Sequence, residues 1–203
     1  MDKLLNLFKS LQIDQGIIEG SREKKTYLSD LQSYFYDSSS VQNRLDENPL
    51  IYRVSSVTPA HGVGQMHYGL GQIMPGTIGS EFFMTRGHFH QDKQAAEIYI
   101  TYTGKGILLL QNLQGECETI KMEPNTIAYV PASTAHRTVN ISNEPLTYLG
   151  IYPANAGHDY TTIEKDNFRN LILKQKNSYQ IVNRSSLSKR YQSHGNPHIE
   201  TPC

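Results

Sequence analysis

The sequence predicts an all-β domain built as a sandwich, a jelly roll or a barrel. Between about residues 50 and 183, short stretches such as LIYRVSSV, AEIYITYTG and LTYLGIYP are rich in β-branched and aromatic residues. Turn-forming residues separate them, as at 112–115 and 142–145, and no helix-length pattern lies between them. Thirteen tyrosines and no tryptophan fit this class, because tyrosine suits strands and sites that bind polyhydroxy ligands.

We expect a single domain over residues 1–203, because the chain is long enough for one substantial core and no repeat or composition shift divides it. The barrel would occupy about 50–183, preceded by an N-terminal arm at 1–45. A polar tail at 184–203 is rich in Gly, Pro and Ser, so we expect it to be loosely held.

The secondary structure of the segments near the two ends of the predicted barrel is less clearly indicated by the sequence. LLNLFKSL places Leu4, Leu7 and Leu11 on one helical face, although short edge strands fit as well. YLSDLQSYFYD at 27–37 fits a helical turn or a wrapping arm. KDNFRNLILKQ at 165–175 fits a short helix.

Charge and hydropathy exclude two classes of partner. Nineteen basic and nineteen acidic side chains cancel, so binding to nucleic acid or an acidic membrane through bulk charge is not expected. The longest apolar stretches are far shorter than the roughly 20 residues of a membrane span, and the N-terminus lacks a signal-peptide pattern. Cys117 and Cys203 give neither a disulfide framework nor a CxxC pair, so we expect a cytoplasmic protein.

Four side chains have the spacing of metal ligands. His88 and His90 are separated by one residue, so both imidazoles point to the same face of a strand. Glu97 begins the next predicted strand, and a hairpin brings its carboxylate beside them; His136 starts another strand after a proline-led turn. Three imidazoles and one carboxylate suit one divalent ion, with Fe2+ as our first expectation and Mn2+, Ni2+, Co2+ or Zn2+ as alternatives. We expect no metal role for His61, His67, His194 and His198.

At these residues the chain resembles the cupin superfamily, whose motifs are G…HxH…E…G and G…P…HxxxN. They are present here as Gly87, His88-Phe89-His90, Glu97 and Gly104, and as Asn125, Pro131, His136 and Asn140. Six residues separate His90 from Glu97, more than in the general motif, and Asn125 replaces a glycine. The resemblance implies a double-stranded β-helix, a jelly-roll barrel with short N-terminal and C-terminal additions.

A closer resemblance is to the cupin-type, archaeal-type phosphoglucose isomerases. It rests on EFFMTRGHFH, AEIY, AHRTVN and IYPANAGHDY, with the longer gap before Glu97, and it covers about residues 27–172. The resemblance implies an aldose-ketose isomerase that interconverts glucose 6-phosphate and fructose 6-phosphate, in glycolysis and gluconeogenesis. It also implies a homodimer.

The family's functional residues can be placed on this chain. The metal ligands fall on His88, His90, Glu97 and His136. The catalytic residues would be Glu97, Tyr99 and His158. The substrate-binding residues would be Tyr52, Thr85, Gly87, Tyr99, Tyr152, His158 and Tyr160. Arg86 is added from its own chemistry, because a phosphate needs cationic donors.

Strand alternation raises a conflict within this set. If His88 and His90 face inward, Thr85 and Gly87 face outward and Arg86 faces inward. A bulge at Gly87, or contacts to substrate through the main chain, would resolve the conflict, and we predict one of these.

Several readings of the chemistry stay open at this stage. The hydrogen could move through an enediol formed by Glu97 as base, or as a metal-assisted hydride shift, and Glu97 could be ligand, base or both. A different metal-dependent cupin enzyme, such as a dioxygenase, would use a similar site. A non-catalytic sugar-binding cupin with a structural metal is the third reading.

Overall fold

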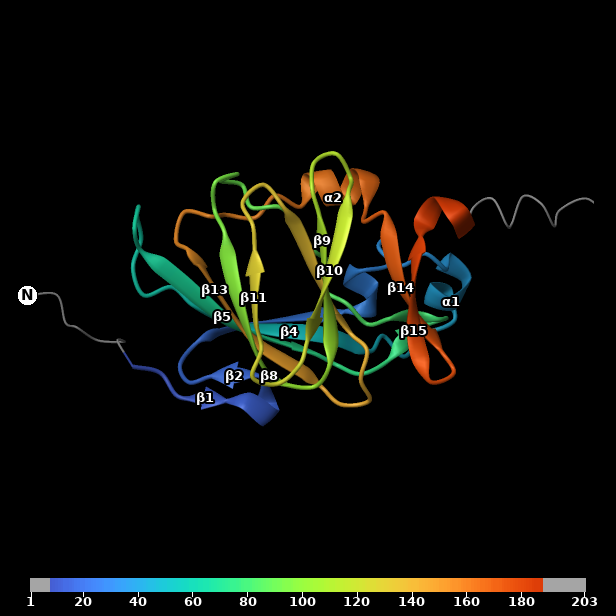
Figure 1. Ribbon diagram of the computed structural model, residues 1–203. Coiled ribbons are helices and arrows are strands. Elements are labelled where there is room, and N and C mark those ends of the chain that lie inside the picture. Colours follow the sequence, from blue (N-terminus) through green and yellow to red (C-terminus); the bar gives the residue numbers. More distant parts are fainter. Residues whose placement is uncertain (1–7, 188–203) are drawn as a thin grey trace, which may run out of the picture.

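Strands make up most of the regular secondary structure in the computed structural model, which describes residues 8–187 (Figure 1). The barrel strands are β3 (Arg22–Tyr27), β4 (Leu50–Val57), β5 (Met66–Ile73), β8 (Glu97–Thr103), β9 (Gly106–Gln111), β10 (Cys117–Met122), β11 (Ile127–Val130), β12 (Ala135–Asn140) and β13 (Leu146–Pro153). The others are β1 (Leu11–Gln12), β2 (Ile17–Ile18), β6 (Thr77–Ile78), β7 (Glu81–Phe82), β14 (Asn170–Gln175) and β15 (Ser178–Asn183). The named helical segments are η1 (Ile13–Gln15), η2 (Leu28–Asp30), α1 (Ser38–Gln42) and α2 (Thr161–Asp166), and residues 184–187 are also helical.

Two antiparallel sheets form the barrel. The larger has six strands in the order β11-β8-β13-β5-β4-β3, and the smaller has three in the order β10-β9-β12. Apolar side chains from both sheets, including Leu108, Val130, Val139 and Leu146, are fully or almost fully buried in one core. The predicted all-β class and its barrel are confirmed.

The N-terminal arm takes part in the barrel. Its strand β3 pairs with β4 along its length and forms one edge of the six-stranded sheet. The LSD segment at 28–30 is the 3-10 helix η2, which fits the helical turn expected at 27–37. Of the described part of LLNLFKSL, residues 8–10 are irregular and only Leu11 lies in a strand, β1. Leu4 and Leu7 lie outside the described residues, as does the predicted tail from residue 188 onward.

The helix expected at 165–175 is wrong for most of its length. Helix α2 ends at Asp166, and β14 begins at Asn170. The apolar residues of β14 belong to a hairpin with β15, and Leu173 also pairs with Glu81 of β7, so cross-strand bonds satisfy the backbone. In Figure 1 this orange and red hairpin lies beside α1 at one end of the molecule. Within residues 8–187, no helix is long and apolar enough to cross a membrane.

Candidate metal and substrate site

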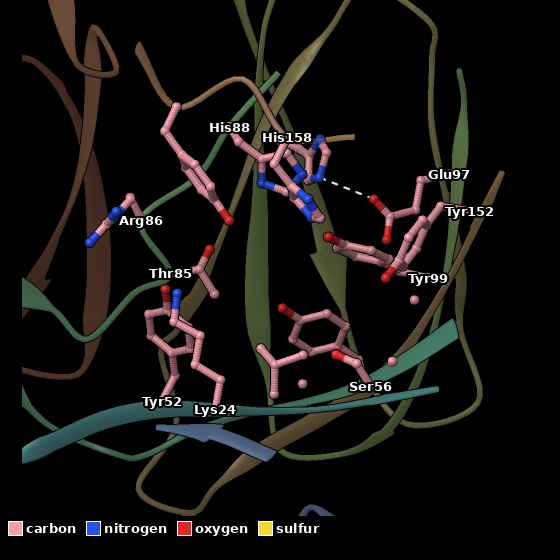
Figure 2. Close-up of a pocket in the computed structure, with 18 residues that line it drawn as sticks. Lys24, Tyr52, Ser56, Thr85, Arg86, His88, Glu97, Tyr99, Tyr152 and His158 are labelled. Carbon is pink, nitrogen blue, oxygen red and sulfur yellow. Dashed lines mark ion pairs between the residues drawn. The ribbon is translucent and has the colours of Figure 1, made fainter. Parts of the chain in front are cut away.

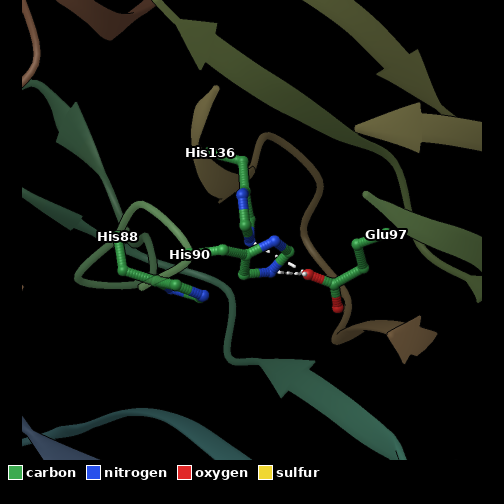
Figure 3. Close-up of side chains that lie close together, drawn as sticks. All are labelled: His88, His90, Glu97 and His136. Carbon is green, nitrogen blue, oxygen red and sulfur yellow. Dashed lines mark hydrogen bonds and ion pairs between the residues drawn. The ribbon is translucent and has the colours of Figure 1, made fainter. Parts of the chain in front are cut away.

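The four predicted metal ligands come together inside the barrel (Figure 3). Glu97 is the first residue of β8, and His136 is the second residue of β12. His88 forms a single antiparallel bridge with His136, which fixes the segment that carries both His88 and His90. One ligand atom from each of the four side chains lies within 4.8 Å of every other. The four side chains therefore form one compact cluster. The predicted strand and hairpin are wrong, however, because His88 and His90 lie outside the named strands and β8 pairs with β11 and β13.

The orientation of the cluster fits a metal ion. His90 Nδ1 lies 3.0 Å from the carbonyl oxygen of Ala95, so this nitrogen donates its hydrogen and Nε2 is left as the possible ligand. Glu97 Oε2 lies 3.3 Å from His90 Nε2 and 3.1 Å from His136 Nε2. The buried Nε2 of His88 and Nδ1 of His136 have no hydrogen-bond partner among the described residues, and Nε2 of His136 has only the ion-pair contact with Glu97. Unpartnered imidazole nitrogens around a buried carboxylate are the donor set of a divalent cation.

The electrostatics favour the ligating forms of Glu97 and His88, whereas the raised pKa of His90 favours its protonated form. Burial by itself raises the pKa of Glu97, but the contacts with His136 and His90 outweigh it and hold the pKa at about 2. Burial, together with the neighbouring His136, keeps the pKa of His88 well below its ordinary value. Burial opposes a charge on His90, yet its contacts with Glu97 and Ala95 raise its pKa. Glu97 is thus anionic and His88 neutral near pH 7.

A cavity of about 220 Å³ opens beside the cluster, which is far more than one water molecule needs (Figure 2). It lies within the barrel, and residues of the six-stranded sheet, of β12 and of the 85–88 segment line it. All of the predicted site residues except the deeper His90 are on its wall. The predicted members are Tyr52, Thr85, Arg86, Gly87, His88, Glu97, Tyr99, His136, Tyr152, His158 and Tyr160.

The backbone at Gly87 resolves the conflict of strand alternation. Its φ is +75°, a left-handed conformation, so Thr85, Gly87 and His88 all reach the cavity wall. Arg137, which is 1% exposed, holds this turn by donating from Nε and Nη2 to the carbonyl oxygen of Arg86, at 3.2 and 2.7 Å. A side chain at Gly87 would lie 2.6 Å from the Phe168 ring. The turn is therefore fixed on both sides.

The aromatic side chains form the wall on the His158 side of the cluster. The rings of His158 and His88 have centroids 4.4 Å apart, and Tyr160 stacks parallel to His158 at 5.7 Å. Burial lowers the pKa of His158, and it raises the pKa of Tyr99 well above its ordinary value. Near pH 7, His158 is neutral and Tyr99 keeps its phenolic hydrogen as a donor.

Several cavity residues were not predicted from the sequence. They are Lys24, Val54, Ser56, Gly69, Gly71, Tyr148 and Gly150. Alternation along LTYLGIYP could have found Tyr148 and Gly150, since they share the face of Tyr152. No local signal marks Lys24 or the two glycines of β5.

The comparisons with known proteins agree with this geometry. A family model described as glucose-6-phosphate isomerase matches residues 24–188. The glucose-6-phosphate isomerase of Pyrococcus furiosus is 40% identical over 85% of this chain and 92% of its own, and that of Thermococcus kodakarensis is 40% identical over 85% and 91%. A putative glucose-6-phosphate isomerase of Rhizobium meliloti is 35% identical over 67% of this chain.

Among solved structures, an oxalate decarboxylase of Bacillus subtilis overlaps 51% of this chain and 26% of its own, with 21% identity and a TM-score of 0.42. An overlap this partial carries no argument about the site. The family model spans residues 24–188, which include every residue of the cluster and the cavity wall, and the Pyrococcus furiosus relative covers 85% of the chain. The chain belongs to the glucose-6-phosphate isomerase family.

Proposed function

We propose that the protein is a metal-dependent aldose-ketose isomerase that interconverts glucose 6-phosphate and fructose 6-phosphate. The observation that supports this most directly is the junction of a three-histidine, one-glutamate cluster with a cavity lined by hydroxyl and imidazole groups. His88, His90, His136 and Glu97 would hold the ion, with Fe2+ as the first candidate. Such an ion, when bound, polarises neighbouring sugar oxygens as a Lewis acid.

The two carboxylate oxygens of Glu97 have different surroundings, so we assign them different roles. Oε2 contacts His90 and His136 and would serve as the ligand. Oε1 lies over Gly150, where an added Cβ would meet it at 2.6 Å, so it faces the floor of the cavity. We assign Oε1 to the proton that moves between C1 and C2. Because the low pKa of Glu97 makes it a weak base, this transfer depends on polarised substrate oxygens.

His158 and Tyr99 supply the remaining polar chemistry. His158 is neutral near pH 7, so a ring nitrogen can exchange a proton with the sugar during ring opening. Tyr99 is protonated and can donate its hydrogen to a sugar oxygen. Tyr52, Thr85, Gly87, Tyr152 and Tyr160 complete the proposed binding wall.

The proposal is tested by a coupled assay on chelator-treated protein, supplied with fructose 6-phosphate and one divalent metal at a time. We expect no glucose 6-phosphate without metal and formation that returns with at least one metal. Turnover by metal-free protein would show that the reaction does not require a metal. Absence of turnover with every metal tested would refute the isomerase function.

Replacement of His158 should affect catalysis and leave metal binding intact. We expect His158→Gln to lower kcat by about 100-fold, a usual loss for a general acid-base group, because its atoms are not among the ligand atoms. The matched control is His67→Gln, because His67 is buried nearby but hydrogen-bonds to the carbonyl oxygen of Ala60 and does not line the cavity. Equal kcat values in the two variants would refute a catalytic role.

We further propose a homodimer in the cytoplasm. Support for a dimer comes from the outer face of β8 and β11, where the opposed Ile98 and Tyr129 are 40% and 58% exposed and Ile127 is 72% exposed. Apolar side chains gathered on an exposed sheet face are typical of subunit contacts. The partner of the cavity would be a sugar phosphate.

A further inference from the structure

The proposed substrate has a reacting end and a phosphate end, and the metal cluster would bind only the reacting end. Carbons C1 and C2 react beside the metal ligands, whereas the phosphate lies at the far end of the sugar and carries the negative charge. A buried or half-buried phosphate needs cationic or N–H donors. Two cationic side chains line the cavity, Arg86 and Lys24.

Arg86 is engaged by the protein through two of its three guanidinium nitrogens, whereas its buried Nε has no hydrogen-bond partner in the described part of the chain. Its Nη2 donates to the carbonyl oxygen of Asp30 at 3.2 Å, and Nη1 lies 3.9 Å from Glu164 Oε1. The guanidinium carbon lies 5.3 Å from the ring centroids of both Tyr34 and Tyr160. Figure 2 shows this group turned away from Glu97 and Tyr99. Its charge is therefore partly compensated and held outside the reacting end.

Lys24 reaches the cavity because of strand register. It lies opposite Val54, which lies opposite Gly71, which lies opposite Tyr148. Directly opposed residues of antiparallel strands point to the same side of a sheet, and all four of these residues line the cavity. Lys24 thus lines the cavity from the edge of the sheet, and it remains exposed to solvent.

Unlike Arg86, Lys24 has no acidic partner among the residues that the structure describes, because the charged residues beside it in sequence pair with one another on the other face of β3. Alternation places Glu23 and Lys25 on the other face of β3, where Glu23 pairs with Lys25 at 3.9 Å and with Arg53 at 3.5 Å. Within residues 8–187, no carboxylate lies within ion-pair distance of the Lys24 ammonium. Figure 2 draws Lys24 with Tyr52 and Thr85 at the cavity end away from Glu97.

We propose that Lys24 binds the phosphate of the substrate and thereby selects sugar phosphates over neutral sugars. This role rests on the proposed isomerase function. An ammonium on a flexible four-carbon stem suits this position, because it can follow the phosphate as the sugar ring opens. Tyr52 and Thr85 would add neutral hydroxyl groups beside the ammonium.

The test compares Lys24→Gln with Lys25→Gln, a matched change of the neighbouring lysine on the opposite face. For Lys24→Gln we expect KM for fructose 6-phosphate to rise about tenfold while kcat changes little, since the contact is remote from C1 and C2. Lys24→Arg should recover most of the loss, and Lys25→Gln should match the unsubstituted protein. Equal KM values in Lys24→Gln and Lys25→Gln would overturn the proposal.

A second measurement separates this proposal from the isomerase function. Inorganic phosphate is titrated into the unsubstituted protein and into Lys24→Gln by calorimetry. We expect saturable binding that weakens about tenfold in the variant. If the protein converts no sugar phosphate, the proposed isomerase function is refuted. The titration would still test whether Lys24 binds a phosphate anion. Equal affinities, or no saturable binding to either protein, would exclude Lys24 as an anion ligand.

Discussion

Glu97→Gln should abolish metal binding and isomerase activity while leaving the fold intact. Loss of a group that merely supports a ligand costs about 10- to 100-fold in metal affinity, so loss of the ligand itself should cost at least about 100-fold. The substitution keeps the shape of the side chain, removes its charge and replaces one acceptor oxygen with an NH2 donor. Metal content per chain and kcat/KM with fructose 6-phosphate are the two measurements.

The matched control for this variant is Glu81→Gln. Glu81 is 4% exposed and Glu97 is 6% exposed, so both carboxylates are buried, but their pKa values are shifted in opposite directions. Burial raises the pKa of Glu81, which accepts the backbone N–H of Tyr36, and a neutral glutamine can accept the same bond. Glu81→Gln should therefore keep its metal and its activity. Native metal content in Glu97→Gln would show that the carboxylate is not a required ligand.

The metal cluster was predictable because its signal is mostly local. His88 and His90 have strand spacing, and Glu97 follows at the start of the next strand. His136 was found through the second motif, and the structure brings it against His88 by a single bridge. Ligands that lie close together in the sequence can be recognised from their spacing alone.

Strand β5 was missed because the cavity requires residues that strands usually avoid. Gly69 and Gly71 lower the β-propensity of MHYGLGQI. A Cβ at Gly71 would lie 2.7 Å from the Tyr148 ring, so the glycine leaves room for that ring. Here tertiary packing outweighs local propensity.

The position of Lys24 could not be predicted for a different reason. Its inward direction depends on the pairing of β3 with β4, which brings together residues about 30 positions apart. The misread helix at 165–175 has another cause, because β14 pairs at six positions with its sequence neighbour β15 and at only one with β7. Non-local pairing has no signature in a short window of one sequence.

Gly150→Ala should weaken metal binding and activity by displacing Glu97. An added Cβ would lie 2.6 Å from Glu97 Oε1 and 3.0 Å from the Tyr99 ring. The carboxylate end of a glutamate moves easily, so the free energy of unfolding should change by no more than about 1 kcal/mol, with part of any loss offset by the stiffer unfolded chain. The displaced carboxylate, however, would no longer be oriented to bind the same ion as the three imidazoles. A loss of about 10- to 100-fold in metal affinity is expected, because ligand orientation is worth that much.

Gly69→Ala distinguishes displacement of the carboxylate from simple filling of the cavity. Gly69 lies directly opposite Gly150 in the sheet and lines the same floor. Its added Cβ would meet its nearest neighbour, Val54 Cγ1, at 3.5 Å, an ordinary contact. Both variants add one methyl group to the floor, but only Gly150→Ala touches a metal ligand. Metal titrations should therefore show native affinity for Gly69→Ala and weakened affinity for Gly150→Ala. Equal affinities would mean that Glu97 adapts without loss, and that its position over Gly150 does not control the site.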